Sequence, residues 1–121
     1  MLIVIKGNCM MERNSGSWNS TPGEVHLSSL MTNDSIRATA LAHELSHALL
    51  GHNRGPYEMA SWEGVIAREF KAWKLAKRLC PRSLWNGPYA RRCLDSYYNA
   101  RHSERSPSLP SRILFPYLPI K

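Results

Sequence analysis

The stretch His43-Glu44-Leu45-Ser46-His47 places two histidines four residues apart, with a glutamate beside the first. In a helix, residues at this spacing lie one turn apart on the same face, so both imidazoles can reach one metal ion. The Glu44 carboxylate can then contact a water held on that metal. Two nitrogen ligands, an open coordination position and a general base are the parts of a zinc peptidase site. A motif this short also arises by chance, so its interpretation depends on the surrounding sequence.

The residues around the motif predict a helix from Ile36 to Leu50. Thr32-Asn33-Asp34-Ser35 offers N-cap oxygens before it, and Gly51 with His52-Asn53 supplies a stop after it. One apolar stripe of this helix is expected to face the core and contains Leu41, Leu45, Ala48 and Leu49. A second apolar group lies above the histidines and contains Ile36 and Ala40. A helix that is apolar on both sides belongs in the middle of a small fold. A single buried histidine is more often a hydrogen-bonded core residue, but two at metal spacing beside a carboxylate favour a metal site.

A catalytic zinc usually has three protein ligands, so a third must come from elsewhere in the chain. A second helix is predicted from about Tyr57 to Cys80, opened by Pro56 and ended by Pro81. One arc of this helix is apolar and contains Trp62, Val65, Ile66, Ala72, Trp73 and Ala76. Glu69 falls in the centre of that arc, where an inward-facing carboxylate needs a cation. We therefore predict that Glu69 is the third ligand.

Three other residues compete for that role. Glu63 lies off the apolar arc and is expected to be solvated or paired with Lys74. Glu58 falls in the first helical turn, where the helix dipole favours any carboxylate. His52 follows the expected helix end, and it can be a helix-end histidine, a contact to substrate or oxyanion, or a ligand. The metzincin pattern HExxHxxGxxH does not apply, because the glycine and the last histidine are misplaced.

The remaining elements predict a small α+β domain. Leu2 to Ile5 reads as a short buried strand, residues 7–23 as loop and turn, and Glu24 to Ser28 as a half-buried strand. A third helix is expected from Pro88 to about His102, with Tyr89, Cys93, Tyr97 and Ala100 toward the core. Residues 103–121 are rich in proline and are expected to wrap over the domain in extended form or to dock on a partner. The predicted fold is a compact zincin-like domain spanning 1–121, with a two- or three-stranded sheet packed on about three helices and the HExxH helix central.

Composition sets bounds on the class of protein. With 121 residues, of which 43% are hydrophobic and 21% charged, the chain is expected to form one globular domain. We find no apolar run of membrane-spanning length, and the apolar run within residues 1–6 is too short for a signal peptide. The three cysteines are too few for a disulfide framework and form no CxxC pair, so cysteine ligation of zinc is not expected. A cytoplasmic protein without membrane association is the resulting expectation.

The net charge of +7 comes largely from the second half of the chain. Its basic residues there include Arg68, Lys71, Lys74, Lys77, Arg78, Arg82, Arg91, Arg92, Arg101 and Arg105. Such a face can attract nucleic acid or an acidic partner, but a solvated helix surface explains it better. No glycine-rich phosphate loop, zinc finger or RNP-like motif accompanies the charge. Nucleic-acid binding is therefore an open but less favoured interpretation.

Two segments resemble the ImmA/IrrE family of zinc metallopeptidases. Residues 39–52, TALAHELSHALLGH, look like its active-site helix, and residues 69–81, EFKAWKLAKRLCP, are similar to its glutamate helix, often written ExxAxxFA. The likeness covers roughly residues 24–81 and departs from the family at Trp73 (usually Asn) and Leu75 (usually Phe). It implies an edge strand before the HExxH helix that holds the substrate backbone. It also implies one Zn²⁺ held by His43, His47 and Glu69.

The resemblance further implies peptide-bond hydrolysis in which Glu44 acts as general base and then as acid. A second group stabilises the oxyanion, and His52, Tyr57 and His26 are the candidates. Asp95 can be a hydrogen-bond acceptor for a ligand histidine or a plain surface acid. The expected partner is a protein or peptide substrate, by analogy a transcriptional regulator. The alternatives are a non-enzymatic zinc-containing protein whose basic face binds nucleic acid or an acidic partner, and an SprT-like DNA-associated protease.

Overall fold

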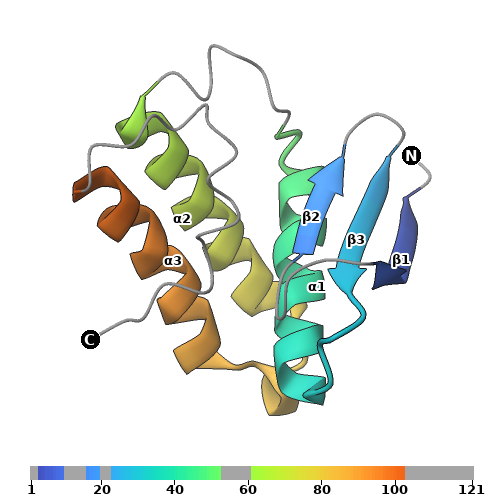
Figure 1. Cartoon of the computed structure of the whole chain (residues 1–121). Coiled ribbons are helices and arrows are strands. Elements are labelled where there is room, and N and C mark those ends of the chain that lie inside the picture. Colours follow the sequence, from blue (N-terminus) through green and yellow to red (C-terminus); the bar gives the residue numbers. More distant parts are fainter. Residues whose placement is uncertain (1–2, 10–15, 20–22, 53–60, 103–121) are drawn as a thin grey trace.

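The computed structural model describes residues 3–9, 16–19, 23–52 and 61–102. Within them the chain is an α+β domain, as predicted, with one three-stranded sheet and three α-helices (Figure 1). Helix α1 lies between the sheet and the pair formed by α2 and α3, and it contacts both. The elements in chain order are β1 (Val4–Cys9), β2 (Gly16–Asn19), β3 (Glu24–Ser28), α1 (Asp34–Leu49), α2 (Trp62–Leu79), the 3₁₀ turn η1 (Arg82–Leu84) and α3 (Gly87–His102).

Strand β3 is the centre of the sheet, whose order is β1-β3-β2. It pairs in parallel with β1 and in antiparallel with β2. Val25 and Leu27 are 0% and 2% exposed and belong to the core, while His26 between them faces the other way. The strand predicted at these residues is confirmed, but the edge position implied by the family resemblance is wrong. Of the two edge strands, β2 is the one that packs on α1, while β1 contacts it through the hydrogen bond from Arg37 to the carbonyl of Gly7.

The sheet also contains backbone that we expected to be loop. Residues 16–19 form β2, and β1 extends to Cys9 rather than ending at Ile5. The expected burial of this first strand is also wrong, because Val4 and Ile5 are exposed. Glycine, asparagine and serine have low strand propensity, which is why the local pattern predicted a loop at residues 7–23. Pairing with β3 overrides that preference, because Trp18 lies opposite Val25 on the side of the sheet that faces the core.

Helix α1 begins after Asn33, whose side chain accepts hydrogen bonds from the backbone of Ser35 and Ile36. The predicted helix is confirmed, but its predicted core stripe is confirmed only in part, because Ala48 is buried and Leu41 and Leu45 pack against the core while Leu49 does not. Leu41 and Leu45 are only half-buried and Leu49 is 59% exposed. The buried arc is made of small and polar residues, namely Thr39, Ala40, Ala42, His43, Glu44, Ser46, His47 and Ala48. The leucines lie at its margins because the sheet and α2 both pack against the small side chains.

Helix α2 is shorter than predicted at its start. Ser61 has an extended backbone and caps the helix through its Oγ, which accepts from the Gly64 N–H at 3.0 Å, so the helix begins at Trp62. The proposed opening at Pro56 and Tyr57 lies outside the described residues. The end is as predicted, with Cys80 as C-cap before Pro81. The predicted inward arc is confirmed apart from Trp62, which is half-buried; its other members are all buried, namely Val65, Ile66, Glu69, Ala72, Trp73 and Ala76.

Helix α3 closes the core on the far side of α2. Tyr89 and Cys93 are buried as predicted, together with Ala90 and Ser96, while Tyr97 is half-buried. The predictions for the side chain of Ala100 and for the proline-rich segment 103–121 concern parts of the chain that the structure does not describe. None of the helices in the described part of the chain combines the length and apolar character needed to cross a membrane.

Candidate metal centre

The two histidines of the motif point their Nε2 atoms toward each other from successive turns of α1. These atoms lie 3.1 Å apart, and the two rings meet edge to face with centroids 4.6 Å apart. Both residues are 8% exposed. As predicted from their spacing of four residues in a helix, the two histidines bring their Nε2 atoms to one point, and this point lies among buried side chains.

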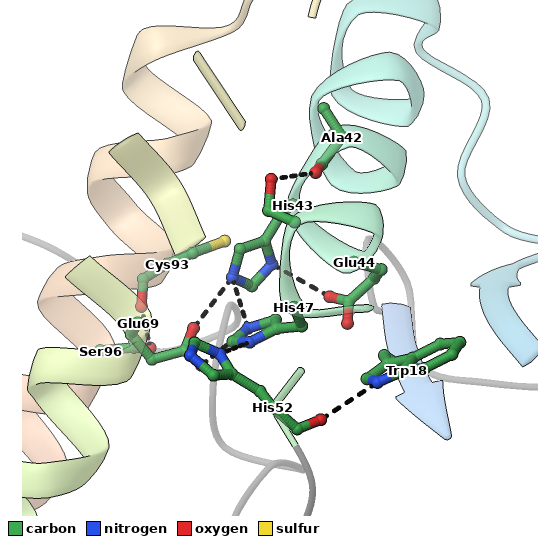
Figure 2. Close-up of polar contacts among 10 residues, drawn as sticks. Trp18, Ala42, His43, Glu44, His47, His52, Glu69, Cys93 and Ser96 are labelled. Atoms are coloured by element: carbon green, nitrogen blue, oxygen red, sulfur yellow. Dashed lines mark hydrogen bonds and ion pairs between the residues drawn. The ribbon is translucent and has the colours of Figure 1, made fainter. Parts of the chain in front are cut away.

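Glu69 reaches the same point from α2 (Figure 2). Its Oε1 lies 2.9 Å from Nε2 of His43, and its Oε2 lies 2.9 Å from Nε2 of His47. The residue is 7% exposed. The sequence signal was a carboxylate in the middle of an apolar arc, and the structure resolves that conflict by pairing the carboxylate with both histidines. The expected meeting of these three residues is observed, while their role as metal ligands stays a prediction.

Charge holds this cluster together when no metal is bound. Burial by itself lowers the pKa of His43, but the charges of Glu44 and Glu69, and hydrogen bonds to both, outweigh it and raise that pKa to about 10. Burial likewise opposes ionisation of Glu69, yet His47 and His43 hold the pKa of its carboxyl well below the ordinary value. At neutral pH the cluster is therefore an ion pair, in which His43 is protonated on both ring nitrogens and positively charged and Glu69 is negatively charged.

Glu44 lies on the other side of the His43 ring. Its Oε2 is 3.0 Å from Nδ1 of His43, the nitrogen that faces away from Glu69 (Figure 2). The side chain packs under β2, where a Cβ added to Gly16 would lie 3.3 Å from Cγ of Glu44. A residue without a side chain at position 16 therefore leaves room for Glu44 between the strand and the helix.

Two sets of ligand atoms are close enough to bind one ion. His43, Glu44 and His47 offer atoms that all lie within 4.8 Å of one another. His43, His47 and Glu69 form the tighter set, because both oxygens of Glu69 contact an Nε2 at 2.9 Å. We favour the second set, since Glu44 contacts His43 through the opposite nitrogen.

The second set suits zinc in chemistry and nearly suits it in size. Two imidazole nitrogens and a carboxylate form a common donor set for catalytic zinc. A tetrahedral zinc with ligands at about 2.0–2.2 Å separates those ligands by about 3.4 Å. The atoms here are 2.9–3.1 Å apart, so the three side chains would have to open by a few tenths of an ångström.

Trp73 has a place in the site that sequence reasoning missed. It was expected to be a core residue, and it also stacks flat on the His43 ring, with centroids 3.8 Å apart and planes 4° from parallel. Trp85 and Tyr89 pack edge-on against Trp73. Its buried Nε1–H has no hydrogen-bond partner among the described residues. No local sequence signal marks this stacking, because it depends on how α2 docks on α1.

His52 contacts the cluster from behind. Its Nδ1 lies 2.9 Å from Nδ1 of His47, the nitrogen that points away from Glu69 (Figure 2). In this arrangement the His52 ring does not face the point between the two Nε2 atoms. It therefore occupies neither the position of a third ligand nor that of a group in contact with the oxyanion. It is a neighbour of a candidate ligand.

One candidate for contact with the oxyanion, His26, is not brought to the cluster. His26 lies on the face of the sheet opposite the buried Val25 and Leu27, and its Nε2 is 2.8 Å from Glu24. Hydrogen bonds from His26 and Lys6 lower the pKa of Glu24. The expectation that His26 contacts the oxyanion is therefore not supported by its position.

The other candidates lie at the surface or outside the described residues. Glu63 is exposed in the first turn of α2, as the sequence suggested. Asp95 pairs with the exposed Arg91 at 3.1 Å, which fits the surface-acid interpretation rather than contact with a ligand histidine. Tyr57 and Glu58 fall in the part of the chain that the structure does not describe.

Comparisons of this chain with protein-family models, with curated proteins and with solved structures find no significant match. The resemblance to the ImmA/IrrE family therefore rests on the motif and the glutamate helix alone. The class of site is defined by its own geometry, namely two histidines, a glutamate from a second helix and an acid beside the first histidine.

Proposed function

We propose that this chain is a zinc-dependent intracellular endopeptidase of the zincin type. His43, His47 and Glu69 would bind one zinc ion, and Glu44 would act as general base and acid. The observation that carries the proposal is the convergence of both Nε2 atoms and both Glu69 oxygens within 2.9–3.1 Å. Burying such a charged cluster costs free energy that packing with apolar residues would avoid. Metal binding explains why the chain has this cluster at a place where apolar residues would be more stable.

The residues have separate tasks in this mechanism. A bound zinc would polarise the substrate carbonyl and make a water molecule acidic enough to attack at neutral pH. Glu44 would accept a proton from the attacking water as the new C–O bond forms, and would donate it to the leaving nitrogen as the C–N bond breaks. This task requires Glu44 to exchange its contact with Nδ1 of His43 for one with the water.

The free edge of β2 supports a peptide as the substrate. Within the described residues, β2 is hydrogen-bonded on one side by β3 and lies beside α1 (Figure 1). An extended peptide can add to such an edge through backbone hydrogen bonds. Gly16, at the end of that strand, packs near Glu44, so a peptide added to β2 would run close to the proposed base. A transcriptional regulator as the natural substrate rests on the family resemblance alone.

One contact favours a second function, zinc binding without catalysis. A carboxylate that only orients a ligand histidine would accept a hydrogen bond from the nitrogen that does not bind the metal. Glu44 lies in that position in this structure, 3.0 Å from Nδ1 of His43. Glu44 therefore separates the two functions, because only the peptidase needs its basicity.

The deciding experiment compares the parent with Glu44→Gln. Glutamine keeps an oxygen that can accept from Nδ1 of His43, but it cannot take a proton. We expect both proteins to bind one zinc and only the parent to cleave fluorescently labelled casein. Glu63→Gln, an exposed glutamate of α2, is the control and should match the parent in both assays. A zinc-loaded parent that cleaves neither casein nor a degenerate quenched-peptide mixture would favour the non-catalytic function.

A further inference from the structure

His52 and His47 face each other through the same ring atom. Their Nδ1 nitrogens are 2.9 Å apart, and their ring planes are inclined by 55°. A contact of this length between two ring nitrogens requires one to donate a proton and the other to accept it. The direction of that hydrogen bond determines which nitrogen of His47 is left with a free lone pair.

The end of α1 places His52 in this position. The N–H of Gly51 donates to the carbonyl of Ala48 at 3.1 Å, and the N–H of His52 donates to the carbonyl of His47 at 2.9 Å. This pair of bonds is the Schellman motif, which needs a left-handed residue at the turn. Gly51 supplies it with φ of 70°. The reversal carries His52 back over the last turn of the helix, beside His47.

Strand β2 holds the same residue from the other side. The Nε1–H of Trp18 donates to the backbone carbonyl of His52 at 3.1 Å, across 34 residues of sequence (Figure 2). His52 is thus fixed by a helix-end motif and by a long-range hydrogen bond. A residue secured twice in this way can hold a neighbouring ring in one orientation.

We propose that His52 is a positioning residue that sets the tautomer and ring orientation of His47. In the metal-free cluster the 2.9 Å contact between Nε2 of His47 and Oε2 of Glu69 is a hydrogen bond with the proton on Nε2. With zinc bound, His47 would instead donate from Nδ1–H to the Nδ1 lone pair of His52, which leaves its Nε2 lone pair for the metal. His52 carries its own proton on Nε2. This inference rests on the zinc-binding part of the proposed function and not on hydrolysis. Residues that orient a ligand histidine in this way typically contribute ten- to hundredfold in metal affinity.

The first test measures zinc affinity by competition with a chromophoric chelator. His52→Phe keeps a ring but removes the acceptor, and we expect it to bind zinc about 10–100-fold more weakly than the parent. His52→Asn replaces Nδ1 by an amide oxygen at a similar distance along the side chain, and it should restore most of the affinity. His26→Phe, a change at a histidine on the outer face of the sheet, is the control and should leave the affinity unchanged.

The second test reads the tautomer directly. Long-range ¹H–¹⁵N correlation spectra of histidine-labelled protein should show His47 protonated at Nδ1 in the zinc-loaded parent and in His52→Asn. They should show His52 protonated at Nε2 and not bound to metal. Far-UV circular dichroism of each variant establishes that it is folded.

Each remaining outcome has one meaning. A parent that binds no zinc overturns the proposed function together with this inference. A parent that binds zinc while His52→Phe binds it equally well overturns only the inference. Equal weakening in His52→Phe and His52→Asn, or a metal-bound nitrogen on His52, also overturns it, because neither result depends on a hydrogen-bond acceptor for His47.

Discussion

The indole of Trp73 lies flat on the imidazole of His43, with ring centroids 3.8 Å apart and planes 4° from parallel. Trp73 comes from α2 and His43 from α1, so this stack joins the hydrophobic core to the candidate metal centre. One face of the His43 ring is thereby covered, and the ring can present its nitrogens only toward Glu69 on one edge and Glu44 on the other.

Loss of the stack should affect both stability and zinc binding. We expect Trp73→Ala to lower the free energy of unfolding by about 3–5 kcal/mol, the usual cost of deleting a buried large aromatic side chain. Trp73→Phe keeps an aromatic ring and should cost less. Urea unfolding followed by circular dichroism measures the first effect, and chelator competition measures the weaker zinc binding.

Phe70→Ala is the matched control for Trp73 on the same helix. Phe70 is 50% exposed, so its removal should change stability by no more than about 0.5 kcal/mol. If Trp73→Phe were as destabilised as Trp73→Ala, the stacking of an aromatic ring on His43 would have no role of its own.

Replacing Glu69 should separate the candidate ligand sets. Glu69→Gln removes the negative charge and one strong ligand, so we expect zinc affinity to fall by more than the roughly hundredfold that loss of an orienting residue causes. Glu63→Gln should bind zinc as the parent does, because Glu63 is exposed. Equilibrium dialysis with zinc analysis by atomic spectroscopy measures both. Undiminished binding in Glu69→Gln would assign the third ligand to Glu44 or His52.

Zinc binding should release a proton and depend on pH. The pKa of His43 is raised to about 10 in the metal-free cluster, so at pH 7–9 the metal must displace a proton from this residue. The apparent affinity should therefore rise with pH, about tenfold per unit for one displaced proton, and level off above about 10. Titration calorimetry in buffers of different ionisation enthalpy counts the protons. An affinity that does not change between pH 7 and 9 would contradict the ion pair.

Gly51 should be replaceable only by residues that tolerate a left-handed backbone. Its φ is 70°, and no atom lies within 4 Å of an added Cβ, so the backbone alone opposes a side chain. We expect Gly51→Ala to cost about 1–2 kcal/mol of stability and to weaken zinc binding by displacing His52. Gly51→Asn should cost less, since asparagine enters this conformation more easily. Thermal unfolding and chelator competition report the two effects, and equal losses for both variants would contradict the backbone explanation.

Features with a local cause were predictable from the chain. The spacing of His43 and His47 and the position of Glu69 in an apolar arc follow from the period of a helix, and the stop at Pro81 follows from the missing N–H of proline. Each depends on residues a few positions apart, so no knowledge of the fold is needed. The meeting of Glu69 with the histidines was a further step, and it succeeded because a buried carboxylate must find a cation.

Features that depend on contacts between distant segments could not be predicted from local sequence patterns. The polar composition of residues 16–19 indicated a loop, and only pairing with β3 makes them a strand. The same pairing makes β3 central and turns His26 away from the cluster. Residues on α1 that looked like core, such as Leu49, are exposed because the sheet and α2 pack on the smaller side chains instead.

The sequence by itself determined that His43 and His47 share one face of a helix and that Glu69 lies on the apolar arc of another, because helix periodicity is a property of neighbouring residues. Tertiary structure alone decided the surroundings of each ring. It placed Glu44 and Trp73 around His43, and it placed His52 behind His47 under a hydrogen bond from Trp18, which is 34 residues away from it. Such contacts arise only when the sheet and the helices pack together, since no local pattern specifies which side chains meet across that distance.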